Sequence, residues 1–199
     1  MKQYVITISR QFGSLGRTIA QQLAQMLEIN FYDRDIVEAT AKRLGQPISV
    51  ISQEEESSGS IFCARKYPLG MGLLSMQEEI FEVQQNIIED LANKESCIIV
   101  GRCGNYILKD HPNALHIYIH APYDKRVKNC TDILGMNVKI AKKYIKEVDR
   151  ARENYRVRYG GEYNNPMDGF DLIIDSSRFG VEGTAQLIER IVRDKMISE

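Results

Sequence analysis

The chain has 199 residues, of which 43% are hydrophobic and 27% are charged, and its formal net charge is -1. This composition is typical of a globular protein and excludes the collagen-like, coiled-coil and low-complexity classes. The near-zero net charge argues against a dedicated nucleic-acid-binding protein. No apolar run approaches the ~20 residues that a transmembrane helix needs, so we expect no membrane span. Four scattered cysteines predict reduced thiols in a cytoplasmic protein.

The charge is unevenly distributed along the chain. Residues 121–160 hold 11 of the 26 Lys and Arg residues but only 5 of the 27 Asp and Glu residues. Such a basic segment forms either a solvated helix face or part of an anion site. Both interpretations remain open from the composition alone.

The first 60 residues predict one strand followed by two helices. A β-branched run at 3–8 predicts a buried strand, and apolar residues at helical spacing predict a helix over 17–28. A second helix is expected over 34–44, because the following Gly45-Gln46-Pro47 punctuates a helix. The polar stretch 52–60 predicts a loop.

The remaining residues repeat the alternation of strands and helices. A Ser75–Glu78 capping box predicts the start of a helix that runs to about residue 93. Pro122 suits the first turn of another helix. Further strands and helices are expected, in chain order, at 97–100 (strand), 115–119 (strand), 138–157 (helix, ended by Gly160 and Gly161), 171–175 (strand) and 181–196 (helix). Strands that alternate with helices predict an α/β domain with a parallel sheet.

The turn between the first strand and the first helix carries the clearest chemistry. We call residues 11–18 the phosphate loop. Glycines at 13 and 16 let the main chain approach a phosphate closely, and the following helix presents its amide groups and positive dipole end. Arg17 adds a cation and Thr18 a hydroxyl for Mg²⁺, as in a P-loop. However, Gln11 stands where that motif has its first glycine, and Arg17 stands where lysine is usual. A simple tight turn is the alternative.

Four segments together resemble the cytidylate kinase-like family of P-loop proteins. They are ISRQFGSLGRTIA, NFYDRDIV, CIIVGRCGNYIL and DLIIDSS, and their order and spacing match over nearly the whole chain. The resemblance implies a P-loop NTPase three-layer α/β fold with a five-stranded parallel sheet in a single domain, 1–199. It implies a helical monophosphate-binding insert at about 34–94 and a lid at about 152–169.

The resemblance also implies an ATP-dependent phosphotransferase that uses Mg²⁺, with a nucleoside monophosphate such as CMP as acceptor. The donor phosphates would lie on the phosphate loop, at Gly13, Ser14, Gly16, Arg17 and Thr18. A homodimer is a further expectation, while no nucleic-acid or membrane partner is expected.

Four residues outside the phosphate loop complete the expected site. Asp33 resembles an aspartate that orients the acceptor or, with Thr18, holds the metal; a helix N-cap is the alternative. Arg102 resembles the arginine of a GRD motif that contacts the monophosphate, although Cys103 replaces the aspartate of that motif. Arg126 resembles an arginine that reaches the phosphates, and Arg152 resembles the lid arginine that neutralises the transferring group. The alternative for Arg126 is a solvated helix face, and the alternative for Arg152 is an intrahelical pair with Asp149 or Glu153.

Other residues and other functions remain open. Arg156, Arg158 and Asp175 are further candidates, whereas the histidines are assigned no chemistry. Acceptor choice would depend on 52–60 and on 67–72, which carry no nucleobase signature. A kinase for another small molecule is therefore an alternative. A nucleotide-binding regulatory protein with weak or no catalysis is another, because Gln11, Arg17 and Cys103 depart from the family pattern.

Overall fold

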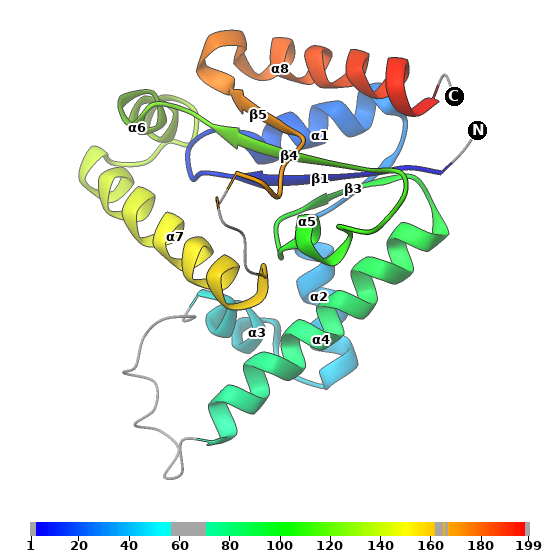
Figure 1. The fold of residues 1–199 in the computed structure, drawn as a ribbon. Helices are drawn as coiled ribbons and strands as arrows, with labels where there is room; N and C mark the ends of the chain where they lie inside the picture. The colour runs from blue at the N-terminus through cyan, green and yellow to red at the C-terminus, as the bar shows by residue number, and fades with distance from the viewer. Residues whose placement is uncertain (1–2, 57–70, 162–164, 166, 198–199) are drawn as a thin grey trace.

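The computed structural model describes residues 3–56, 71–161, 165 and 167–197. Five parallel strands form one sheet in the order β2-β3-β1-β4-β5 (Figure 1). The strands are β1 (Val5–Arg10), β2 (Asn30–Tyr32), β3 (Cys97–Val100), β4 (Ala114–His120) and β5 (Leu172–Asp175). Because all five strands run in the same direction, their carboxyl ends lie along one edge of the sheet, where α/β proteins bind ligands.

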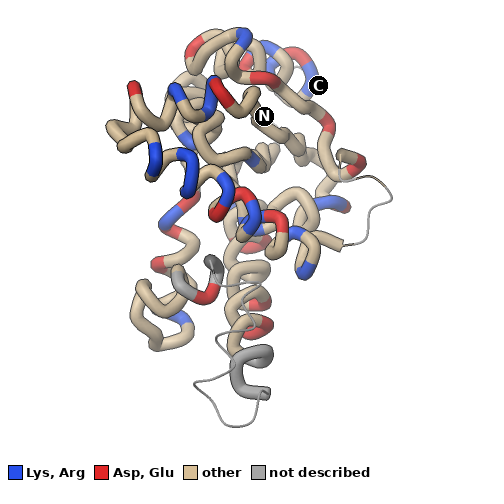
Figure 2. The backbone as a smooth tube through the Cα atoms, turned by 90° about the vertical axis from the view of Figure 1, so that its left-hand side faces the viewer, with Lys and Arg blue, Asp and Glu red and all other residues tan. Residues whose placement is uncertain are grey.

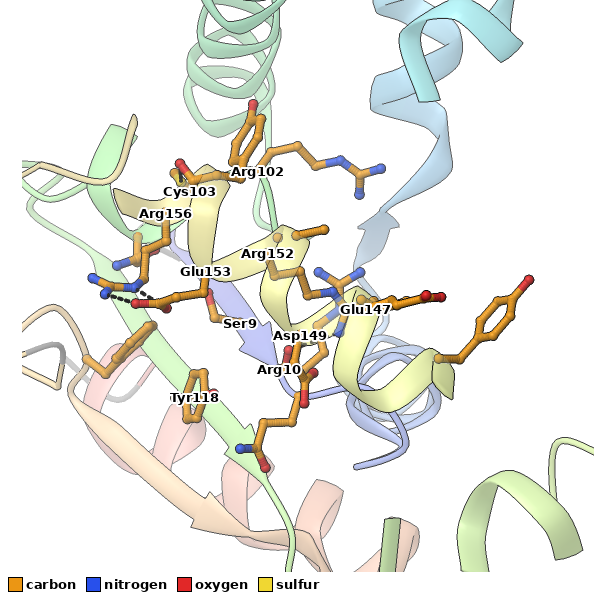
Figure 3. Close-up of a pocket in the computed structure, with 18 residues that line it drawn as sticks. Ser9, Arg10, Arg102, Cys103, Tyr118, Glu147, Asp149, Arg152, Glu153 and Arg156 are labelled. Carbon is orange, nitrogen blue, oxygen red and sulfur yellow. Dashed lines mark hydrogen bonds and ion pairs between the residues drawn. The ribbon is translucent and has the colours of Figure 1, made fainter. Parts of the chain in front are cut away.

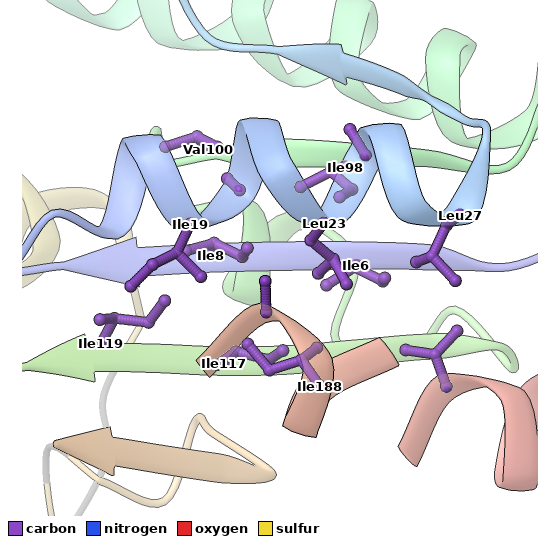
Figure 4. Close-up of a cluster of buried hydrophobic side chains, with 14 of the residues drawn as sticks. Ile6, Ile8, Ile19, Leu23, Leu27, Ile98, Val100, Ile117, Ile119 and Ile188 are labelled. Carbon is purple, nitrogen blue, oxygen red and sulfur yellow. The ribbon is translucent and has the colours of Figure 1, made fainter. Parts of the chain in front are cut away.

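Helices α1 (Gly16–Leu27) and α8 (Ser176–Val192) cover one face of the sheet. Ile19 and Leu23 of α1 and Ile188 of α8 pack on the alternate strand residues Ile6 and Ile8, and all five side chains are fully buried (Figure 4). At Gly180 the backbone of α8 is not helical (φ 68°, ψ -174°). Regular helix therefore resumes at residue 181, where the sequence predicted the last helix to start.

The opposite face is covered by α2 (Arg34–Leu44), α4 (Met71–Lys94) and the short α5 (Gly104–Ile107). Ile36 of α2 and Ile88 of α4 pack there against Val5 and Ile99 of the strands. Strands buried on both faces read as continuous apolar runs, which explains why β1 and β3 were predictable. The expected three-layer α/β fold with a five-stranded parallel sheet is confirmed.

The region between α2 and α4 differs from the prediction. Residues Ile48–Glu56 form helix α3, so the expected loop at 52–60 is wrong for 52–56, and 57–60 lie outside the described residues. The burial of Ile51 explains the helix, because this side chain packs against Val37 and Ile80 and has no exposed surface. The capping box is also wrong, because α4 already begins at Met71 and Ser75 lies inside that helix. Of the segment 67–72, residues 67–70 lie outside the described residues.

Helices α6 (Tyr123–Asp132) and α7 (Val138–Tyr159) flank the carboxyl edge of the sheet. Figure 2 faces this side of the molecule, where Lys and Arg recur along the helices. The lysines of α7 are exposed, whereas Arg126 and Arg152 turn inward. The solvated helix face is therefore present at the lysines, and the anion site stays a prediction. Among the described residues, no helix is long and apolar enough to cross a membrane.

Candidate active site

The phosphate loop joins β1 to α1 at the carboxyl edge of the sheet. Gly13 has a φ of +77°, and a Cβ there would lie 2.9 Å from both the Arg126 carbonyl oxygen and the Cys130 Sγ. Leu15 adopts a φ of 62°, which is uncommon for a residue with a side chain. Gly16 packs closely on β1, since its Cβ would lie 2.7 Å from the Cβ of Arg10. The loop thus keeps a left-handed turn at position 15 despite the leucine.

Side chains from the surrounding helices hold the carbonyl groups of the phosphate loop. Asn129 donates to the Gly13 carbonyl at 2.9 Å, and Ser176 donates to the Ser14 carbonyl at 2.8 Å. The Ser14 hydroxyl donates to the Gln11 carbonyl at 2.9 Å, which makes Ser14 part of the turn. The first amide groups of α1 have no partner within the helix, as at every helix start. The loop therefore directs amide groups, together with the helix dipole, toward a bound anion.

Arg126 lies behind the phosphate loop. Its Nη1 donates to the Phe12 carbonyl at 3.2 Å and pairs with Asp149, which also accepts from the Phe12 amide at 2.7 Å. The side chain is 10% exposed and is not among those that line the cavity described below. The structure therefore corrects the expected contact between Arg126 and the phosphates. The Arg126–Asp149 pair positions the loop against α7.

Asp33 stands at the centre of three arginines. Its Oδ1 accepts from Arg102 Nη1 and lies 3.6 Å from Arg10 Nη2, and its Oδ2 lies 3.0 Å from Arg17 Nε. Asp33 occupies the N-cap position of α2, as the alternative expected, but its side chain makes no capping hydrogen bond. Burial would raise the pKa of Asp33, but Arg102, Arg10 and Arg17 together lower it by more. The carboxylate is therefore ionised at neutral pH.

A cavity of about 650 Å³ opens between the sheet edge and α7 (Figure 3). Arg10, Arg102 and Arg152 contribute its positive charge, and Tyr118 and Phe170 form an aromatic wall with ring centroids 5.1 Å apart. The other lining residues include Ser9, Gln11, Cys103, Asn105, Tyr144, Tyr155 and the Arg156–Glu153 pair. A cationic pocket with an aromatic wall is suited to a phosphorylated ligand that carries a flat ring.

Arg152 reaches the cavity from α7. Its Nη1 donates to the Arg10 carbonyl at 3.0 Å. This contact positions the side chain, in place of the intrahelical pair that was the alternative. Tyr155 and Tyr159 fix this part of α7 against α4, through a 2.8 Å hydrogen bond from the Tyr155 hydroxyl to Gln84 and a ring stack between Tyr159 and Phe81 at 4.3 Å. The structure thus places Arg152 on a rigid element.

Arg10 is the site residue that the sequence analysis missed. It ends β1, and only 14% of its side chain is exposed. Burial, and then the positive charges of Arg152, Arg102 and Arg17, hold the pKa of Arg10 well below its usual range, against the opposing effect of Asp33. The sequence did carry a signal for this residue, because an arginine at the carboxyl end of a buried strand lies at the edge where such sheets bind ligands.

Arg102 follows β3 on an unusual turn. Gly101, Arg102 and Cys103 have φ values of 81°, 51° and 53° in succession. Such conformations cost energy in residues with side chains and often occur at functional sites. Burial raises the pKa of the Cys103 thiol to about 12, so this position supplies no negative charge. Arg102 donates to Asp33 and lines the cavity, and the neighbouring position 103 carries a thiol instead of a carboxylate.

The remaining candidates are engaged with other protein groups. Asp175 caps α8 by accepting from the Ser177 amide at 3.0 Å, and Arg158 contacts Gln77 and Glu78 of α4. Arg156 lines the cavity but is paired with Glu153. The three described cysteines are buried free thiols, and Cys63 lies outside the described residues.

Comparison with known sequences identifies the family. Residues 5–178 match the cytidylate kinase-like family. The chain belongs to this family. It is 28% identical to a cytidylate kinase of Methanosarcina barkeri over 182 residues, which cover 87% of this chain and 88% of the relative. It is 25% identical to a cytidylate kinase of Archaeoglobus fulgidus over 198 residues, which cover 96% of each chain. Family membership supports a kinase for a nucleotide or small molecule.

Solved structures agree on the fold of this cytidylate kinase-like protein. An uncharacterized protein from Eubacterium ventriosum superposes with a TM-score of 0.72 at 24% identity, covering 97% of this chain and all of the other. Shikimate kinase from Acinetobacter baumannii superposes with a TM-score of 0.54 at 14% identity, covering 98% and 96%. At these identities the likeness concerns the fold alone.

Of the two residues expected to hold Mg²⁺, Thr18 suits the ion and Asp33 does not. Thr18 is exposed at the start of α1 and offers a hard hydroxyl oxygen, which Mg²⁺ accepts as a ligand. Asp33 does not fit, because both of its oxygens face guanidinium groups. Among the described residues, no group of three or more His, Cys, Asp or Glu could hold a metal. A bound Mg²⁺ would therefore take Thr18 and the phosphates of the donor as ligands.

Gly13→Ala should reduce the free energy of unfolding by about 2 kcal/mol and weaken ATP binding. Alanine is strained at a positive φ, and its Cβ would press on the Arg126 carbonyl and Cys130. Urea denaturation and ATP titration measure the two effects. Gly135→Ala is the matched control, since its φ is +67° but no atom lies within 4 Å of its Cβ. Equal effects of the two substitutions on ATP binding would contradict the close packing of the loop.

The Asp33 carboxylate should stabilise the fold at neutral pH but not in strong acid. Its pKa is lowered in the folded state, so its contribution is present above the unfolded aspartate value of 3.8 and is lost as pH falls through the folded value. We expect Asp33→Asn to be less stable than the native protein at pH 7 and equally stable at the acid end. Denaturation curves across pH, with the exposed Asp35→Asn as control, test this. A stability difference independent of pH would contradict it.

Proposed function

We propose that this protein is an ATP-dependent phosphotransferase whose acceptor is a nucleoside monophosphate, with CMP as the first candidate. One observation carries the proposal. The phosphate loop and the arginine-lined cavity meet at the same edge of the sheet, so an anion on the loop would face an anion in the cavity. The names of the two archaeal relatives support CMP as the acceptor.

The donor side is the phosphate loop. Its amide groups and the α1 dipole would bind the phosphates of ATP, and Arg17 would add a cation, since its side chain is half exposed and able to turn toward them. Thr18 would share Mg²⁺ with the donor phosphates, where the ion supplies charge neutralisation. Gly13 and Gly16 allow the close approach.

The acceptor side is the cavity. Arg102 would bind the monophosphate, because a guanidinium matches phosphate oxygens in a two-pronged geometry. Tyr118 and Phe170 would pack against the base. Asn105 also lines the cavity, with its Nδ2 on the Gly169 carbonyl at 3.3 Å, which leaves its amide oxygen to face a polar edge of the ring.

The transfer step would depend on Arg152. Phosphoryl transfer is promoted mainly by positioning and by neutralising charge on the transferring oxygens. Arg152 bridges from α7 to the end of β1, between the phosphate loop and the cavity. Of the predicted lid at about 152–169, residues 152–159 belong to α7, and 162–164 and 166 lie outside the described residues. A lid over the cavity would exclude water during transfer.

A transfer screen tests the proposal. Purified protein and Mg·ATP are mixed with one acceptor at a time, and acceptor-dependent ADP release is measured. The acceptors are CMP, UMP, AMP, GMP, dCMP and shikimate. The proposal predicts the largest kcat/KM with CMP and loss of activity in Arg17→Ala and Arg152→Ala. Transfer to shikimate but to none of the nucleotides would contradict a nucleoside monophosphate as the acceptor. ATP binding without transfer to any acceptor would overturn the enzyme assignment and leave nucleotide sensing.

A further inference from the structure

Three guanidinium groups converge on one carboxylate at the centre of the site. Arg10 comes from the end of β1, Arg17 from the start of α1 and Arg102 from the turn after β3. All three contact Asp33, which is 4% exposed. A carboxylate held on both oxygens by arginines has the contacts that a bound phosphate would have.

Positive groups surround Arg10. The charges of Arg152, Arg102 and Arg17 lower its pKa, and Asp33 is the anion that opposes them. The other carboxylates that line the cavity have cationic partners: Asp149 pairs with Arg126, Glu153 with Arg156 and Glu147 with Lys143. Buried positive charge is costly unless an anion compensates it. This arrangement therefore favours a second anion, with a charge greater than that of a carboxylate.

The cavity gives such an anion access to the same arginines. Arg10 and Arg102 line it, with side chains 14% and 12% exposed, whereas Asp33 meets these guanidinium groups from outside the lining. A phosphoryl group entering the cavity would share their N–H donors with Asp33 and be repelled by its charge.

We propose that Arg10 is an additional phosphate-binding residue, and that Asp33 is an internal counter-anion that competes with the bound phosphoryl group for Arg10, Arg17 and Arg102. Before the ligand binds, the Asp33 carboxylate compensates the positive charge of these arginines and holds their side chains in place. This role differs from orienting the acceptor or holding the metal, because each of those predicts weaker ligand binding when the carboxylate is removed.

The inference rests on the proposed function only in that the anion is a phosphoryl group. Its test therefore uses binding without turnover, with inorganic phosphate as the probe. Calorimetric titration compares the native protein with Asp33→Asn and Arg10→Met. We expect Asp33→Asn to bind phosphate at least about tenfold more tightly and Arg10→Met at least about tenfold more weakly, as for single charge-assisted hydrogen bonds.

Matched controls are Asp35→Asn, an exposed aspartate two residues away, and Arg150→Met, an exposed arginine of α7. Both should bind phosphate as the native protein does. Melting curves add a second readout: Asp33→Asn should melt lower without phosphate and gain more from added phosphate than the native protein gains.

Unchanged or weaker phosphate binding by Asp33→Asn would overturn the competition. Unchanged binding by Arg10→Met would overturn the assignment of Arg10, and this variant decides the question if Asp33→Asn does not fold. Because neither result depends on ATP, a failed transfer screen leaves this test intact.

Discussion

Arg152→Met is expected to lower kcat about 10³-fold, the size of effect seen when an arginine that neutralises a transferring phosphoryl group is removed. Arg152 lies between the phosphate loop and the cavity and is held there by the Arg10 carbonyl at 3.0 Å. Its charge should matter most in the transition state, where the oxygens of the moving group carry the charge to be neutralised. The KM values for ATP and acceptor should therefore change little.

Steady-state kinetics on Arg152→Met and Arg150→Met tests this expectation. Arg150 is an exposed arginine on the same helix, so its removal should leave kcat near the native value. Melting curves check that α7 stays packed in both variants. A rise in KM with an unchanged kcat would contradict the transition-state role and make Arg152 a ground-state binding residue.

Arg102→Met is expected to raise the KM for the acceptor about 10- to 100-fold, the loss expected for charge-assisted hydrogen bonds to phosphate. Arg102 sits on a left-handed turn and lines the cavity while donating to Asp33. The KM for ATP should change far less, because the proposed donor site is the phosphate loop. Arg102→Lys should recover little, since an ammonium group cannot bind phosphate through two parallel donors.

Lys109→Met is a useful comparison for Arg102, because Lys109 is an exposed cation shortly after the same turn. It should leave the acceptor KM unchanged. If Arg102→Met raised the KM for ATP as much as that for the acceptor, the division of the site into donor and acceptor sides would be wrong.

Strands β1 and β3 were predictable because they are buried on both faces, whereas the partly exposed β2 was not predicted as a strand. Residues such as Ile6, Ile98 and Ile117 have no exposed surface, and continuous apolar runs identify such strands without knowledge of their neighbours. Helix α3 was not predictable in the same way. Among its side chains that the structure describes, only Ile51 is buried, and the polar residues from Ser52 onward carry no helical pattern of apolar residues. The contact of Ile51 with Val37 and Ile80 reveals the helix.

The site was predictable in part. The resemblance directed attention to Asp33, Arg102 and Arg152, which the structure brings to one region. Arg10 was missed and Arg126 was given a different role, for the same physical reason. The direction of an arginine side chain depends on its tertiary partners: Arg126 is drawn to Asp149 behind the loop, and Arg10 is drawn to Asp33 in front of it.

The proposed activity moves a phosphoryl group from ATP to a nucleoside monophosphate. The most direct test follows a mixture of protein, Mg·ATP and CMP by phosphorus NMR. CDP and ADP should appear together in equal amounts, and neither should form with Arg152→Met on the same time scale. ADP and inorganic phosphate formed without CDP, or no change in either nucleotide, would contradict it.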